Sequence, residues 1–157
     1  MNDLLRDRVA DYLRAHHTMT IATTAPGGNE PHAAAVFYAV DHDLRLVFLS
    51  KPTSIHGTHI GVAAPVAVTV TEDCEDWEMI QGVQVWGEAE LLSGVAKAGA
   101  FAVYVKRFPF VRDLMVHHAM AALIRDIGVY RVTPRRVAFT DNTTGVFGRE
   151  MLEPVTE

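Results

Sequence analysis

The chain has 157 residues, 49% of them apolar, and a formal net charge of −5, which is the profile of a single globular domain over residues 1–157. The negative charge, without a basic stripe, argues against nucleic acid as a partner. No apolar run approaches the roughly 20 residues that span a bilayer, so we expect no membrane segment. The single cysteine, Cys74, excludes an internal disulfide and fits a cytoplasmic protein.

Hydrophobic periodicity divides the first half of the chain into short elements. We expect a helix over 3–16, strands over 18–24, 32–40 and 44–50, and a short helix over 54–62. The tight turn at 41–43 predicts that the strands on either side of it form an antiparallel hairpin.

The second half continues with strands and adds more helix. The predicted elements are strands over 65–71 and 81–92, helices over 93–108 and from 110 to about 127, and a final strand pair, or one bent strand, over 129–132 and 136–140. Gly87 interrupts the long strand, where it marks a bulge or a close approach to a ligand. Six or so short antiparallel strands predict a mainly β protein with peripheral helices, closed as a small barrel because closure removes exposed sheet edges.

The segment from Leu46 to Ile60 is a candidate anion site. An apolar strand ends at Ser50, and a proline turn leads to a helix that begins near Ser54 and His56. Hydroxyl and cationic groups beside the free N–H groups of a helix start can bind phosphate, and Lys51 adds positive charge. The alternative is an ordinary capped surface helix.

Three consecutive alanines, Ala33, Ala34 and Ala35, followed by Val36, are unusual in a strand, because strands favour large branched side chains. Small side chains would let a flat ligand lie against the backbone. Tight packing of the first helix is the equal alternative.

The remaining chemistry-bearing residues point to no protein nucleophile. His56 and His59 are spaced to share a helical face, but no carboxylate completes a metal set, so we expect no metal site. The chain has no Gly-x-Ser-x-Gly elbow and no Gly-x-Gly-x-x-Gly or Walker loop. Trp86, beside Gly87, is the aromatic residue best placed to contact a planar ligand, on the face opposite Val83 and Val85.

Several short motifs together resemble one family over roughly residues 10–142. They are Phe48-Leu-Ser50, His56-Gly57, Gly82-Val-Gln-Val-Trp-Gly87, Arg107-Phe-Pro-Phe110 and Phe139-Thr-Asp-Asn142. The combination resembles the pyridoxamine 5′-phosphate oxidase-like superfamily of FMN-binding split β-barrels, and within it a small bacterial subgroup. The resemblance implies a six-stranded antiparallel split β-barrel that forms a homodimer with flavin at the interface.

The resemblance also implies where FMN would lie. The isoalloxazine would lie along the backbone of Ala33, Ala34, Ala35 and Val36, and the phosphate would contact the turn at Leu49, Ser50, Lys51, Ser54 and His56. Gln84 and Trp86 would face the ring or the partner subunit. Here Ser54-Ile55-His56 replaces the Ser-Arg-Lys of the true oxidases, which predicts weaker or pH-dependent phosphate binding.

We therefore expect an FMN-dependent oxidoreductase acting on a small-molecule substrate that the sequence does not identify, with the flavin carrying the electrons. Three alternatives stay open: a non-catalytic flavin binder, a haem-binding relative that uses a histidine, and a deazaflavin-dependent reductase on the same barrel.

Overall fold

A computed structural model describes residues 3–145 and 147–153. Its helices are α1 (Asp3–Ala15), α2 (Ile55–Ile60), α3 (Gly94–Arg107), α4 (Phe110–Val116) and α5 (His118–Arg125), with short 3₁₀ turns η1 (Trp77–Met79) and η2 (Asn142–Thr144). Its strands are β1 (Thr18–Thr24), β2 (Pro31–Phe37), β3 (Ala39–Val40), β4 (Leu46–Ser50), β5 (Ala63–Thr71), β6 (Gln81–Leu91), β7 (Gly128–Asp141) and β8 (Arg149–Leu152). No helix among these residues has the length and apolar character needed to cross a membrane.

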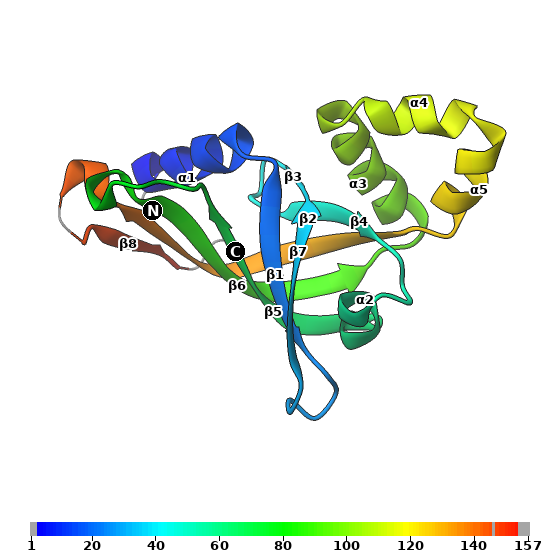
Figure 1. Ribbon diagram of the computed structural model, residues 1–157, viewed down its shortest axis with the longest axis horizontal. Coiled ribbons are helices and arrows are strands. Elements are labelled where there is room, and N and C mark those ends of the chain that lie inside the picture. Colours follow the sequence, from blue (N-terminus) through cyan, green and yellow to red (C-terminus); the bar gives the residue numbers. More distant parts are fainter. Residues whose placement is uncertain (1–2, 146, 154–157) are drawn as a thin grey trace.

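The strands form one antiparallel sheet in the order β2-β1-β5-β6-β7-β4-β3, and β8 pairs with β7 (Figure 1). Only Tyr38 separates β2 from β3, which are the two edge strands of that order, so the sheet curls until its ends meet. β3 pairs with the start of β4 through Ala39 and Val40, whereas β2 forms no ladder with β4. The result is the expected mainly β antiparallel sheet, but it is a half-barrel that stays open along a seam between β2 and β4 rather than a fully closed barrel.

The described residues form eight strands rather than the expected six, because β3 and β8 are additional. The expected strand 32–40 breaks at Tyr38, because the chain leaves β1 there to pair with β4. The final segments form one long strand, β7, which confirms the single-strand alternative of that prediction. β8 was not expected, because Arg149, Glu150 and Met151 are exposed and only Leu152 is buried.

Two apolar clusters hold the sheet. Inside the curl, α1 packs Leu5, Val9 and Leu13 against the strands, and Phe48 stacks on Tyr130 with ring centroids 5.1 Å apart. Outside the curl, α3 packs on β4 and β7 through a set that includes Val47, Ala100, Tyr104, Phe108 and Val129. Each large apolar side chain that is fully buried contributes about 1.5–3 kcal/mol, so both clusters stabilise the sheet.

Two further predictions concern the bulge at Gly87 and the extent of the second long helix. The bulge at Gly87 is confirmed, and the close approach there is to the backbone of Thr133, whose carbonyl oxygen would lie 2.4 Å from an added Cβ. β7 begins at Gly128, directly after the predicted helical segment. The second predicted helix is two helices, because the extended backbone of His117 separates α4 from α5.

Candidate functional site

The edge of β2 along the seam exposes unpaired backbone groups. Tyr38 donates its N–H to the carbonyl of His17 at 3.0 Å, which fixes the alternation of the β1–β2 ladder. In that alternation, Ala33 and Ala35 direct their N–H and C=O groups away from β1, and these groups find no other backbone partner in the part of the chain that the structure describes. An edge of this kind can hydrogen-bond the rim of a flat polar ligand.

The side chains of β2 alternate between the core and the outside. Ala34 and Val36 pack against the inner cluster, whereas Ala33 and Ala35 are exposed. Phe37 continues the outer row and is 51% exposed. The alternative that the alanines accommodate the first helix is therefore wrong for the two outer alanines, which leave open space beside the seam.

The turn after β4 is held by one hydroxyl. Ser54 caps α2 by accepting a hydrogen bond from the N–H of Gly57 at 3.1 Å, and its Oγ donates to the carbonyl of Lys51 at 2.7 Å. Gly57 is required by this packing, since an added Cβ would lie 2.5 Å from the Lys51 carbonyl oxygen. The turn is thus a compact preformed unit that brings Ser50 and Ser54 together, with their Oγ atoms 3.3 Å apart.

His56 lies behind this turn and is buried. Its Nε2 is 2.6 Å from Ser50 Oγ, and its ring stacks on that of His32 with centroids 6.0 Å apart. His59 meets His32 edge-on at 6.0 Å and bonds Thr23 Oγ1 through Nδ1 at 2.9 Å. Burial first, and then the imidazoles of His32 and His59, lower the pKa of His56 below its usual range, so it is neutral near pH 7.

These contacts correct the helix-start interpretation of the site. α2 has only six residues, and its cap is already satisfied, so a helix dipole is not what would hold an anion here. Ser54 uses its single proton on Lys51, and Ser50 can donate to a ligand only when His56 Nε2 carries the proton between them. Lys51 is exposed and forms no ion pair among the described residues, which leaves it as the fixed cation of the turn.

The other predicted contact residues lie apart from this turn. Leu49 points to the outside of the sheet, where it packs with the α3 cluster. Gln84 and Trp86 lie on the same outer face as Ala33 and Ala35 but three strands away, which is roughly 14 Å at the usual strand spacing. Gln84 accepts from Arg149 at 2.9 Å, and the guanidinium of Arg136 lies 4.1 Å from the Trp86 ring centroid. Neither side chain can reach the β2 seam of its own chain.

His32 and Thr23 also belong to the site, although no local sequence pattern identified them. Both residues lie on strands, in register with each other across β1 and β2, and they meet α2 only because the sheet curls. The spacing of His56 and His59 was the visible signal, and it predicted a shared helical face rather than contact with a third imidazole. No group of three His, Cys, Asp or Glu residues in the described ranges has a geometry that could hold a metal ion.

The curled antiparallel sheet with its open seam is a split-barrel fold, and solved structures share it. A haem-binding protein from Mycobacterium smegmatis superposes with a TM-score of 0.70 at 18% identity, covering 92% of this chain and 57% of that one. The haem storage protein HutZ from Vibrio cholerae superposes at 0.67 and 16% identity, covering 83% and 89%. A pyridoxinephosphate oxidase family protein from Clostridium acetobutylicum superposes at 0.66 and 9% identity, covering 98% and 96%.

Residues 5–141 match the family described as pyridoxamine 5′-phosphate oxidase, and the chain belongs to that family. A UPF0306 protein of Klebsiella pneumoniae is 33% identical over 144 residues, which cover 91% of this chain and 88% of that protein. The UPF0306 protein YhbP of Salmonella newport is 30% identical over the same shares. The expected family is therefore confirmed, and the chain is similar in sequence to the UPF0306 proteins, a small bacterial subgroup.

Proposed function

We propose that this protein binds FMN in the seam between β2 and β4 and acts as a flavin-dependent oxidoreductase on a small-molecule substrate. The observation that carries the proposal is the free edge of β2 at Ala33 and Ala35, on the strand whose His32 stacks on His56. The residues fit the cofactor: unpaired backbone groups can bond the polar rim of the isoalloxazine, small side chains leave room for the ring, and the turn offers a cation to the phosphate.

The bound flavin would supply the electron transfer, and the chain's own groups would bind and orient it. Lys51 would contact the phosphate as a fixed charge. Ser50 would donate its hydroxyl proton to a phosphate oxygen when His56 Nε2 is protonated, since that ring nitrogen is 2.6 Å away. Ser54 would hold the turn in shape through Gly57 and Lys51 rather than contact the phosphate directly.

The proposal includes a homodimer. The outer face of β2, β1 and β5 carries small side chains, and Phe37 and Ile55 beside it are 51% and 55% exposed. A second copy seated on this face would bury them and bring its Gln84 and Trp86 within reach of the ring. The single exposed cysteine supports a cytoplasmic location, which stays a prediction.

The first test is the absorption spectrum of the purified protein during titration with FMN. A flavin spectrum with bleaching by NAD(P)H under anaerobic conditions supports the oxidoreductase, and flavin binding without bleaching supports a passive flavin binder. Light scattering at micromolar concentration tests the dimer. A protein that takes up no flavin, and is monomeric, contradicts the proposal.

A paired variant tests the location of the phosphate. Lys51→Gln with His56→Gln removes the fixed cation and the imidazole that frees the Ser50 hydroxyl, and should weaken FMN about tenfold or more while leaving riboflavin, which lacks the phosphate, unchanged. Lys97→Gln is the control, because it removes one exposed charge from α3 rather than from the turn after β4. Equal losses for FMN and riboflavin would show that the phosphate lies elsewhere.

Haem is the second candidate. It is favoured by the haem-binding structures that share the fold, and by His32, whose ring is only partly buried and makes no hydrogen bond in the described part of the chain. A neutral imidazole nitrogen that is free of other partners can serve as an axial ligand. A Soret band on titration with haem, lost in His32→Ala, would replace the flavin proposal.

A further inference from the structure

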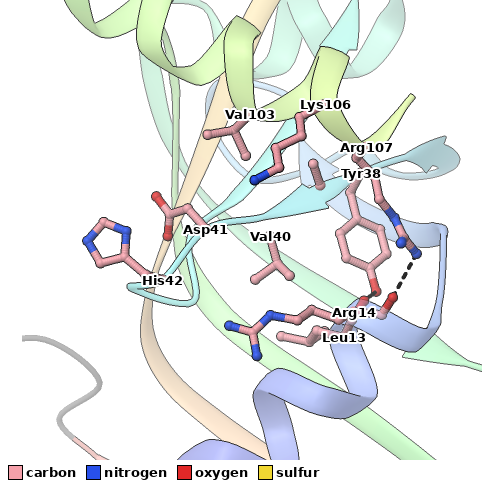
Figure 2. A pocket seen from close by; sticks show the side chains of 10 residues that line it. Leu13, Arg14, Tyr38, Val40, Asp41, His42, Val103, Lys106 and Arg107 are labelled. Atoms are coloured by element: carbon pink, nitrogen blue, oxygen red, sulfur yellow. Dashed lines mark hydrogen bonds between the residues drawn. The ribbon is translucent and has the colours of Figure 1, made fainter. Parts of the chain in front are cut away.

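A separate cavity lies where the end of α1, the β3–β4 turn and the end of α3 meet (Figure 2). Its volume is about 480 Å³, which is within the range of roughly 300–1,000 Å³ found for small-molecule sites. Arg45 pairs with Asp41 in the β3–β4 turn, and the extended chain from there to Ser50 spans roughly 16 Å. The cavity is therefore distinct from the turn at Ser50 and His56.

The floor of the cavity is apolar and rigid. Leu13 and Tyr38 are fully buried, and Val40 and Val103 complete the surface. The Tyr38 hydroxyl donates to the carbonyl of Leu13 at 2.6 Å, and burial raises its pKa, so it stays protonated and keeps this bond. Tyr38 therefore supports the floor from beneath, and its hydroxyl is not available to a ligand.

The rim of the cavity carries three cationic side chains, from two helices. Arg14 comes from the last turn of α1, and Lys106 and Arg107 come from the last turn of α3. Cations are common in last turns because they compensate the helix dipole, but here two helix ends converge on one cavity. Figure 2 shows Arg14 and Lys106 extending along opposite sides of Val40.

The positive charge of this rim is only weakly compensated. Lys106 forms no ion pair within residues 3–145 and 147–153, and Arg107 donates to two carbonyls, those of Arg14 at 2.7 Å and His16 at 3.2 Å. Arg14 meets Asp11 at 3.6 Å, in an exposed pair that contributes little.

The carboxylate that lines the cavity is already engaged. Asp41 accepts from Nε of Arg45 at 2.7 Å and from the backbone N–H groups of Asp43 and Arg45 at 2.9 and 3.0 Å. Arg45 thus neutralises Asp41 from outside the cavity, and the lining keeps an excess of positive charge beside an apolar floor.

We propose that this cavity binds a small organic anion, with a flat or branched apolar body on Val40 and Val103 and an anionic head group between Arg14 and Lys106. The apolar floor gives the body its burial, and the two flexible cations can close on a carboxylate or phosphate from both sides. Arg107 fixes the end of α1 against α3, and so holds the walls of the cavity at the right separation. The proposal does not depend on flavin binding.

The probe is 2-naphthoate, with 2-naphthamide as its neutral counterpart. Isothermal titration of the full-length protein gives the affinities, and methyl NMR locates the probe by shifts of the Val40 and Val103 resonances. Naphthoate should bind about tenfold or more tightly than naphthamide, because only naphthoate brings a charge to the rim. Equal affinities would overturn the anion assignment, and this comparison needs no variant.

Variants then locate the head group. Arg14→Gln with Lys106→Gln should weaken naphthoate about tenfold or more, whereas Lys97→Gln, which removes one charge from the other end of α3, should change its affinity less than about twofold. Circular dichroism checks that each variant is folded. Saturating FMN should leave naphthoate binding unchanged; competition between the two, or full affinity in the double variant, would overturn the proposal.

Discussion

The helices α1 and α2 both pack on the inside of the curled sheet, but they do so with opposite chemistry. α1 buries Leu5, Val9, Tyr12 and Leu13, whereas α2 buries an imidazole, a glycine and Ile60. Burial of large apolar side chains stabilises a fold, while a buried polar group costs free energy unless it is hydrogen-bonded. The packing around α1, called here the α1 end, therefore stabilises the fold. The packing around α2, called here the α2 end, includes buried polar groups that stability alone does not require.

This difference predicts that damage to the two ends will separate stability from ligand binding. Variants at the α1 end should lower the free energy of unfolding without changing the flavin affinity of the folded protein. Variants at the α2 end should change flavin affinity at a smaller cost in stability.

Leu5→Ala should have the largest effect on stability. Leu5 is 2% exposed inside the inner cluster, and removing a buried leucine side chain costs about 2–5 kcal/mol of unfolding free energy through lost burial and the cavity left behind. Urea unfolding measures the loss. The neighbouring Leu4 is 79% exposed, so Leu4→Ala should change the stability by less than about 0.5 kcal/mol. Similar losses in both variants would mean that α1 does not pack as described.

Gly57→Ala should act mainly on the α2 end. An added Cβ would lie 2.5 Å from the Lys51 carbonyl and 2.9 Å from Ser54 Oγ, so the turn must open, at a cost of about 1–3 kcal/mol and with a loss of FMN affinity. Gly99→Ala on α3 is the matched control, because nothing lies within 4 Å of its added Cβ. Alanine is favoured over glycine in a helix by about 1 kcal/mol, so the control should be stabilised. Unfolding curves that move in the same direction for both would refute the close packing of the turn.

Local sequence patterns predicted most helices and strands. They failed where a strand boundary depends on pairing with residues that are distant in the sequence. The helix at 3–16, the strand at 18–24 and the bulge at Gly87 depend on neighbouring residues and are confirmed. The break at Tyr38 arises because the residues before it pair with β1 and those after it pair with β4. A short stretch of sequence around Tyr38 contains no information about this change of partner. The end of α4 at His117 carries neither glycine nor proline, so the sequence gives no signal there.

The candidate site followed the same rule: residues that are close together in the sequence were predicted, and residues that only the sheet brings together were not. Ser54 and His56 were found because capping residues and a histidine stand close together in the sequence. His32 was missed because it reaches His56 only through the pairing of β2 with β1 and the curl of the sheet over α2. The free backbone edge at Ala33 and Ala35 also depends on the ladder with β1, although the small side chains themselves were visible.

The smallest predicted effect is a pH dependence that belongs to the α2 end alone. The pKa of His56 is below its usual value in the free protein, and a bound phosphate would raise it by stabilising the imidazolium. Between these two pKa values FMN binding takes up a proton, so FMN affinity should rise as the pH falls through that window, by at most about tenfold per pH unit for one proton. Riboflavin carries no phosphate, and its affinity should stay flat.

The measurement is the ratio of FMN to riboflavin affinity at several pH values above the second pKa of the phosphate, which is about 6. His56→Gln should flatten the ratio, because glutamine can still bond Ser50 but does not titrate. His42→Gln, on the exposed β3–β4 turn, should leave it unchanged, since that imidazole lies at the α1 end of β4. A ratio that is flat in the unmodified protein would mean that no phosphate lies against Ser50 and His56, and the polar character of the α2 end would then need another ligand to explain it.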